Sequence, residues 1–528
     1  TNTGTVTGNN ISTGGVCGEN NNGGKVVGSH NEGNVTGTNQ TGGVCGNNVG
    51  SSVTGCTNTG MVTGTNQCIG GVCGQNLSNG TVEGSHNEGN VTGTNENGQQ
   101  IGGVCGYIES GTVNGCYNSG TVTGKYSFTG GVCGQNNGNV QKSYNTGNVS
   151  GKNNVGGVCG SCSYNGSATV QECYNTGTVS GTNYVGGVCG QNQPQGTVNG
   201  CYNTGDVSGT NSVGGVCGQN NGNVNGCYNT TGEVPGTGVV TGDSLVGGVC
   251  GMNNGTLENS YNTGEVSGKD CVGGVCGQNY ISGTVKVCYN TGEVTGNSKF
   301  GGVYGENRNI VRECYYLADT RGEPIKGCAP RTAVDFQRGE VAFLLQKALG
   351  QHSPQVWGQT LGKNASPVLK WQTDDYKQVY YAKPDSPCKG GFSNTNGEEL
   401  QHNYKNGKCF YCGQPEIAYT VTIPASVTLG STVNVKATDV TLPNNKQLNV
   451  KVADTSPFEV AQVDDTNTVI DKCAYTVTNG ETTVNPGSTV LTAVNGDTQK
   501  IVDLRFNAPA TTYSGTYTGT VNFTVSVE

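Results

Sequence analysis

Single apolar positions recur along residues 14–305 at a regular spacing, separated by glycine, asparagine, serine and threonine. The phrase GGVCG, in its last copy GGVYG, occurs eleven times, and each copy but the last is followed by a second phrase such as CYNTG and then a valine. The mean spacing of about 29 residues lies in the range typical of solenoids, propellers and repeat arrays. Because no helical periodicity accompanies it, the pattern predicts stacked parallel β-coils.

Alternation within the second phrase assigns its side chains to the two faces of a strand. Cys116, Asn118 and Val122 share one face, and Tyr117 lies on the other. The first set is small or apolar, so we expect it to face inward. Coils stacked about 4.8 Å apart place like residues in columns, and ten such steps make a rod on the order of 50 Å long. We therefore expect a parallel β-solenoid of about eleven coils over residues 1–316.

Two polar columns follow from this stacking. An asparagine recurs from Asn31 to Asn290, and stacked amides of this kind hydrogen-bond along a cross-β stack. An aromatic column lies beside it, and we expect its rings to face solvent. Either these rings stabilise the sheet and bind nothing, or they form a stripe that contacts sugar rings or a partner protein. The candidate ligand-binding residues are Tyr117, Tyr144, Tyr174, Tyr202, Tyr228, Tyr261 and Tyr289.

Cysteine is unusually frequent, with 25 residues in the chain. Most of them occupy fixed repeat positions, which favours a role as small buried apolar residues. The alternative is a set of disulfides that link one coil to the next.

The phrases GGVCGQN, CYNTG and VSG resemble the GLUG repeat of secreted and surface-attached bacterial proteins. The resemblance covers about residues 1–316, and the cysteine after GGV departs from the usual apolar residue. It implies an extracellular location, either secreted or at the cell surface, and a place in an adhesin-like protein or in an accessory region of a secreted peptidase.

The repeat pattern ends after Cys314, and residues 317–385 read as a small α/β cap on the open end of the solenoid. An amphipathic helix is expected over 332–349, ended by Gly350. Residues 386–416 form a short Cys/His unit that is too small to bury a core and needs a stabilising cross-link, such as a metal ion or a disulfide.

In this unit Cys409 and Cys412 form a CxxC knuckle, and Cys388 and His402 complete a possible tetrahedral set for structural zinc. A disulfide of Cys388 and redox chemistry are the alternatives for these cysteines.

Alternating apolar and polar residues return in the last part of the chain, residues 417–528. Short runs such as YTVTIPASVTL and GTVNFTVSV are separated by glycine, asparagine, proline and aspartate, which predicts an antiparallel β-sandwich. Its end, SGTYTGTVNFTVSVE, resembles the closing strands of Ig-like modules in Gram-positive surface proteins.

Charge and motif content narrow the function. Charged residues make up 12% of the chain and the net charge is −9, which argues against nucleic-acid binding. There is no run of 18 apolar residues, so no membrane-spanning helix is predicted. With four histidines and no HExxH, nucleophile-elbow or P-loop motif, we expect no enzymatic activity.

The sequence therefore predicts an extracellular structural or adhesive surface protein, a rod that presents or links binding modules. Two alternatives stay open: a carbohydrate-binding module that uses the tyrosine stripe, and a non-catalytic arm of a secreted peptidase. The chain reads as a processed form or a fragment, and its first coil needs a cover. We expect end-to-end association or fibre assembly of copies, or an upstream cap.

Overall fold

The computed structural model consists of two compact units, residues 1–381 with 394–396 and residues 382–393 with 397–528. The finer predicted division at 316, 385 and 416 stays a prediction. The residues that the structure describes are 1–9, 11–96, 100–163, 166–231, 238–318, 326–350, 353–360, 364–372, 402, 404–405, 407–409, 414–443 and 445–528.

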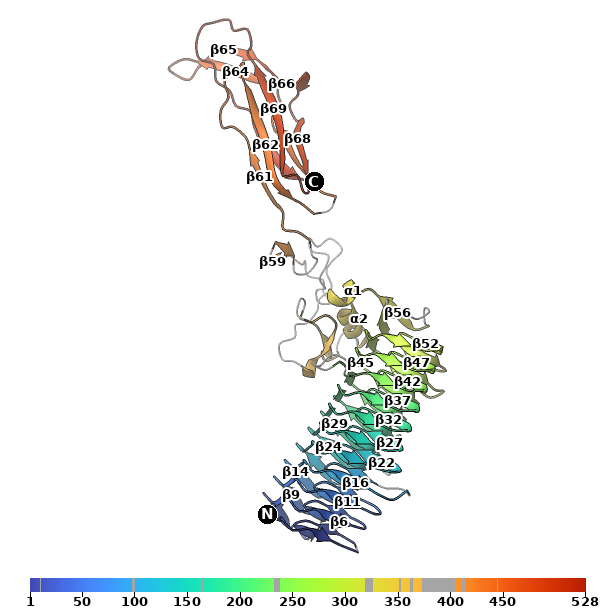
Figure 1. Cartoon of the computed structure of the whole chain (residues 1–528). Helices are drawn as coiled ribbons and strands as arrows, with labels where there is room; N and C mark the ends of the chain where they lie inside the picture. The colour runs from blue at the N-terminus through green and yellow to red at the C-terminus, as the bar shows by residue number, and fades with distance from the viewer. Residues whose placement is uncertain are drawn as a thin grey trace. The chain divides into compact units, whose positions relative to one another are not determined.

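The first unit begins with a solenoid in which each coil contributes one short strand to each of five parallel sheets (Figure 1). Four sheets contain eleven described strands, and the fifth contains twelve because β56 (Cys328–Arg331) follows the last coil. A middle coil consists of β27 (Asn153–Gly156), β28 (Cys159–Cys162), β29 (Ala168–Gln171), β30 (Tyr174–Asn175) and β31 (Val179–Ser180). Two of the sheets run from β1 (Val6–Thr7) to β51 (Val294–Thr295) and from β2 (Thr13–Gly14) to β52 (Ser298–Gly301). Two more run from β3 (Cys17–Asn20) to β53 (Tyr304–Asn307) and from β4 (Lys25–Val27) to β54 (Ile310–Arg312). The last runs from β5 (His30–Asn31) through β55 (Cys314–Leu317) to β56.

Neighbouring coils pair in register, with like residues opposite one another. Cys45 lies opposite Cys73, and Val207 lies opposite Val240 although a longer loop separates them in the sequence. The loops absorb the differences in length, while the strands keep their pairing. The predicted parallel β-solenoid of about eleven coils is confirmed.

The interior of the solenoid holds two separate apolar columns. Valines and cysteines such as Val158, Cys159 and Cys173 form the first, and valines such as Val155 and Val179 form the second. The predicted inward face is also confirmed, because Cys116, Asn118 and Val122 are completely buried.

The glycine pair of each GGVCG phrase makes this narrow interior possible. A Cβ atom added at Gly156 would lie 2.0 Å from the Cys159 carbonyl oxygen, and one at Gly157 would lie 2.3 Å from Asn175 Cγ. Both distances are shorter than any real contact, so the close approach of the chain requires glycine at both positions.

The buried asparagines form the predicted ladder of amides. Asn175 Nδ2 donates to Gly177 O at 2.7 Å and to Asn203 Oδ1 of the next coil at 2.8 Å. Equivalent bonds between coils continue from Asn31 to Asn290 at 2.7–2.8 Å. Each amide of the ladder before Asn290 thus donates to an acceptor in its own coil and to one in the next.

A second asparagine ladder follows the GGVCG phrase. Asn192 Nδ2 donates to Asn220 Oδ1 at 2.8 Å, and the series continues to Asn307. It is interrupted where Ile108 and Cys162 replace the asparagine. Sequence analysis missed this ladder, although the asparagine of GGVCGQN was visible.

The cap covers the last coils, and its described residues contain two α-helices. The expected single helix over 332–349 is wrong: α1 (Ala333–Gln337) and α2 (Glu340–Ala348) are separated at Gly339, whose φ of 83° lies in the left-handed region. Thr332 begins α1 with a capping box closed by Asp335. The remaining described cap elements are β57 (Trp357–Gly358), its partner β58 (Val368–Leu369) and the short helix η1 (Lys370–Gln372).

The second unit contains a small hairpin and a set of antiparallel sheets. The hairpin joins β59 (Tyr404–Lys405) to β60 (Lys408–Cys409). One sheet has the order β61 (Ala418–Thr422), β62 (Thr432–Thr441), β69 (Gln499–Asn507), β66 (Thr476–Asn479) and β67 (Thr482–Val484). The others are β68 (Thr489–Val494), β63 (Gln447–Val452) and β70 (Phe523–Val527), and the pair β64 (Glu459–Val463) and β65 (Val469–Ala474).

The sheets share one core, in which Ala437 and Leu504 of the first sheet cluster with Val450 and Leu491 of the second. The antiparallel fold predicted for this part of the chain is confirmed.

We predict that replacing one buried ladder amide weakens the solenoid much more than replacing an exposed one. Asn175→Ala removes the two hydrogen bonds that Asn175 donates and the one that it accepts from Asn145, which costs about 2–4 kcal/mol. Asn139→Ala, at an exposed position of a neighbouring column, serves as the control and should cost under about 0.5 kcal/mol. Urea unfolding followed by circular dichroism measures both, and equal losses would contradict the role of the ladder.

Candidate functional site: the tyrosine column

The seven predicted tyrosines form one continuous stack along the solenoid. From Tyr117 to Tyr289 neighbouring ring centroids lie 4.7–5.1 Å apart, and their planes differ by 2–10°. His86 extends the stack by one ring at 4.6 Å from Tyr117. The spacing matches the step between paired strands, so in-register stacking of the coils sets it.

Because each ring is stacked face to face on the next, the ring faces inside the column are covered. The column therefore presents ring edges and hydroxyl groups at its surface. A flat ligand cannot stack on an inner tyrosine as a sugar ring stacks on an isolated one.

The cap covers the C-terminal part of the column. Tyr228, Tyr261 and Tyr289 are 9%, 5% and 0% exposed, whereas Tyr117 and Tyr144 are half-buried. The expectation that all seven rings face solvent is therefore wrong for the last three. Tyr174 and Tyr202 are also half-buried.

The covered part shows how protein groups bind this column. The Tyr289 hydroxyl donates to Pro367 O at 2.6 Å, and Gln372 Nε2 donates to the Tyr261 hydroxyl at 2.7 Å. The Trp357 ring lies 5.7 Å from Tyr289 and 6.1 Å from Tyr261, tilted by 59° and 56°. Tilted aromatic contacts of this kind place an electropositive ring edge near an electron-rich face.

Burial also affects the ionisation of the tyrosine hydroxyls in the column. Desolvation raises the pKa of Tyr174 and Tyr202, and it raises the pKa of Tyr261 and Tyr289 further because the cap excludes water from them. The hydroxyls are therefore neutral at physiological pH and can both donate and accept hydrogen bonds.

The cysteines of the coils are packing residues. Apart from the half-buried Cys17 they are buried, and their thiols are free. Cys116 Sγ donates weakly to Asn114 O at 3.4 Å, and burial raises the pKa of this thiol to about 12. Such a thiol is a poor nucleophile, because only the thiolate reacts.

The structure describes two of the four predicted zinc ligands. Cys409 is buried in β60, and the His402 ring stacks on Tyr404 at 5.4 Å. Cys388 and Cys412 lie outside the described residues. Within the described ranges no group of three or more histidine, cysteine or acidic side chains is placed to hold a metal ion. The zinc set therefore stays a prediction.

Comparisons with known proteins give little information about this chain. No protein-family model matches the sequence, and no curated protein matches it significantly. Among solved structures, the crystal structure of "a putative immunoglobulin A1 protease" from Bacteroides ovatus matches at 17% identity with a TM-score of 0.31. The match covers 54% of this chain and 86% of that one, and it is too distant to indicate an activity.

None of the described helices is long and apolar enough to cross a membrane.

We predict that the buried thiols make the solenoid sensitive to alkaline pH. Folding raises the pKa of Cys116 from an ordinary value of 9.0 to about 12 through burial. The neutral thiol is thus favoured in the folded state. Its contribution to the free energy of unfolding is present below pH 9 and is lost as pH rises from 9 towards 12.

Cys116→Ser tests this contribution, because serine already occupies the equivalent position at Ser85 and Ser143. Between pH 7.5 and 10.5 the variant should lose about 1–2 kcal/mol less stability than the parent chain in urea unfolding. An identical pH profile for the two proteins would show that the thiol does not ionise on unfolding.

Proposed function

We propose that this chain is an extracellular structural or adhesive protein, in which the solenoid is a stiff rod and the tyrosine column is its contact surface. The observation that carries the proposal is the in-register pairing of eleven coils, whose loops vary while their strands do not. Stacking of this kind builds a one-dimensional scaffold with long parallel surfaces. The resemblance of the phrases GGVCGQN and CYNTG to GLUG repeats supports the extracellular location.

The acidic residues of the solenoid support a role without catalysis. Asp206, Glu265 and Glu293 follow one another along one column, a coil or more apart, at positions that are exposed or half-exposed. Paired acid and base groups need to converge on one substrate. A column with a single carboxylate per coil on the outer surface is better suited to solvation of the rod.

We propose that the ligand of the column is a polypeptide that approaches the ring edges of Tyr117, Tyr144 and Tyr174. The cap supports this choice, because Trp357 and the amide of Gln372 bind the same column three to four coils beyond Tyr174. The covered ring faces argue against a glycan that stacks on the tyrosines.

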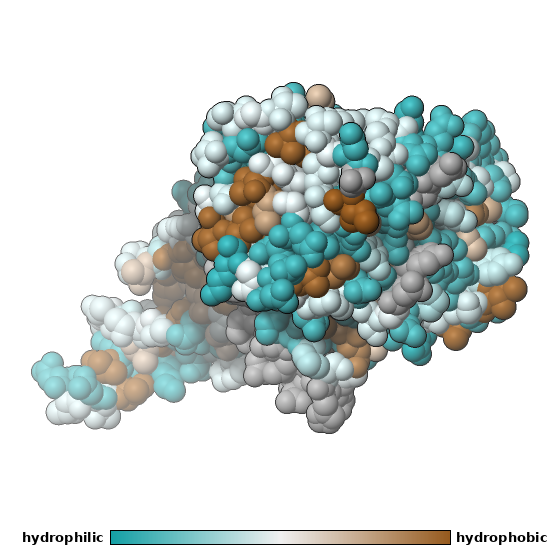
Figure 2. All heavy atoms as spheres, turned by 90° about the horizontal axis from the view of Figure 1, so that it is seen from below, coloured by the Kyte–Doolittle hydropathy of each residue, from teal (hydrophilic) through white to brown (hydrophobic). Residues whose placement is uncertain are grey.

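The proposal includes association of copies, and the solenoid carries exposed apolar side chains. Ile11, Val16 and Val27 in the first coil are 70%, 42% and 62% exposed. Figure 2 views the molecule from this end and shows apolar patches among polar residues. The opposite end of the solenoid is covered by β56 and the cap helices. Light scattering on the purified chain tests end-to-end association, with a mass that rises with concentration as the expected result and a monomer at all concentrations as the contradicting one.

Surface display tests the proposed function. We expect an antibody raised against the solenoid to label intact cells of the source organism, and we expect a deletion strain to show no labelling and reduced adhesion to protein-coated surfaces. Labelling that appears only after the cells are permeabilised would contradict an extracellular role.

We predict that a peptide of residues 353–372, added in trans, binds the uncovered tyrosines. This peptide carries the Trp357 and Gln372 side chains that contact the covered part of the column. Binding should be weak, with a Kd of about 0.1–1 mM by NMR titration, since few side chains are involved.

The triple variant Tyr117→Ala, Tyr144→Ala, Tyr174→Ala should abolish this binding, and the Trp357→Ala peptide should bind at least about fivefold more weakly. A glycan array provides the competing outcome. Glycan binding that depends on the three tyrosines, together with no peptide binding, would overturn the polypeptide assignment.

A further inference from the structure

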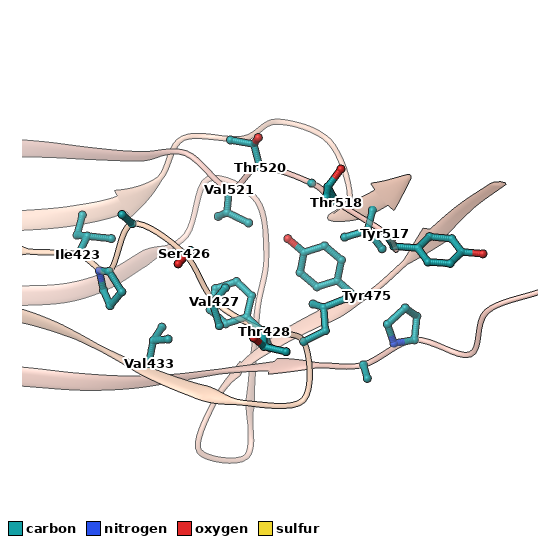
Figure 3. Close-up of a pocket in the computed structure, with 18 of the residues that line it drawn as sticks. Ile423, Ser426, Val427, Thr428, Val433, Tyr475, Tyr517, Thr518, Thr520 and Val521 are labelled. Carbon is teal, nitrogen blue, oxygen red and sulfur yellow. The ribbon is translucent and has the colours of Figure 1, made fainter. Parts of the chain in front are cut away.

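A cleft opens between the two sheets of the C-terminal sandwich. One wall is the segment 423–429, which leads from β61 to β62, and the other is the segment 515–521, which leads to β70. The cleft has a volume of about 650 Å³, and none of its lining residues is charged. Figure 3 shows Val427 and Val521 on its two sides.

The floor of the cleft is the core of the sandwich. Val435, Val460, Tyr475 and Phe506 line it, and all four belong to the buried cluster that the sheets share. The cleft is therefore the open margin of the interface between the two sheets, where apolar core side chains lack a cover.

Both walls carry backbone groups that are ready to pair. In the part of the sandwich that the structure describes, no hydrogen bond involves the backbone N–H of Ala425, Ser426, Val427, Thr428 or Leu429. The N–H and C=O groups of residues 519–521 also have no partner there, although the adjacent Thr518 pairs with Ala461 in both directions at 2.8 and 2.9 Å. Each wall is thus a segment outside the regular strands whose backbone groups are available to a partner.

A polar group inside the cleft also lacks a partner. Tyr475 is 7% exposed, and among the described residues its hydroxyl makes no hydrogen bond. By contrast, the neighbouring Tyr517 hydroxyl donates to Asp471 Oδ2 at 2.6 Å. In Figure 3 the Tyr475 ring lies between the two walls with its hydroxyl directed into the cleft, whereas Tyr517 points away.

We propose that this cleft binds an extended β-strand of another protein, with uncharged apolar side chains at alternate positions. Such a strand can pair its backbone with 425–429 while every second side chain covers the apolar floor. Five wall residues correspond to a strand of about 17 Å. A small apolar molecule gains nothing from the wall N–H groups, and the backbone groups of a helix are already paired within the helix.

A labelled peptide with valine at alternate positions, KTVTVTVTK, tests this binding to the full-length chain by fluorescence anisotropy. Its scrambled form KVVVTTTTK controls for composition. A third peptide, N-methylated on the residues that would pair, keeps the side chains but cannot form the backbone bonds. The proposal predicts binding of the first peptide and at least about tenfold weaker binding of the other two.

Two variants and one control locate the site. Val427→Asp places a charge at a lining residue that is 37% exposed and should weaken binding at least about tenfold, because the strand would bury that charge. Tyr475→Phe keeps the ring and should weaken binding about fivefold through the lost hydrogen bond. Val494→Asp, at a 44% exposed residue outside the cleft, should leave binding unchanged. Circular dichroism confirms that each variant is folded.

Three outcomes would overturn the proposal. Equal binding of the N-methylated peptide would identify an apolar small-molecule pocket instead of a strand site. Binding that survives Val427→Asp would place the peptide elsewhere. Dimers in light scattering that dissociate with Val427→Asp would assign the cleft to a second copy of this chain.

Discussion

The solenoid depends on one constraint: a buried amide must find a hydrogen-bond partner, and the next coil supplies it. In the narrow interior, Asn175 has no access to water, and its Nδ2 pairs with Gly177 of its own coil and Asn203 of the next. An unpaired buried amide would cost about 1–3 kcal/mol. Each coil therefore needs a neighbour with asparagine at the same place, and in-register parallel stacking follows. The same register sets the tyrosine rings 4.7–5.1 Å apart and covers their faces.

The ladder ends where the following strand no longer supplies an asparagine. Asn290 lies opposite Tyr316 instead of an asparagine, and Cys276 lies opposite Tyr304. Both tyrosines are buried, and the Tyr304 hydroxyl donates to Lys326 O at 3.2 Å. Large side chains thus fill the space that a further coil would occupy, and the cap then covers the last rings of the column. The solenoid ends because its repeated residues change.

Much of this fold can be predicted from the sequence, because stacking repeats the same local rule in every coil. The period, the inward face of Cys116 and Val122 and the asparagine ladder all follow from strand alternation and spacing. The second ladder was harder to see, since Ile108 and Cys162 interrupt it. The break at Gly339 divides a helix whose apolar pattern is continuous, and only its left-handed backbone reveals the break.

The candidate sites depend on contacts between distant parts of the chain, and sequence alone does not give them. No local sequence pattern shows that Trp357 packs against Tyr261, nearly a hundred residues earlier in the chain. The same holds for Pro367, whose carbonyl accepts a hydrogen bond from Tyr289. The cleft beside Val427 arises because two segments without regular strand structure face each other across the sandwich. At the tyrosine column, exposed protein surface continues a contact that the chain already makes with itself. This continuity is the reason for proposing a polypeptide as the ligand of the column.

The most direct test of the stacked, in-register solenoid is a set of distances measured along one column of the folded chain. Met61, Thr178 and Glu293 are exposed residues of one column, and unnatural amino acids at these positions can carry spin labels for pulsed electron resonance. Four coils separate each neighbouring pair, so the two shorter distances should each be about 19 Å and the longest about 38 Å. Distances that do not add in this way, or a broad distribution for the outer pair, would contradict the columnar stacking on which the account depends.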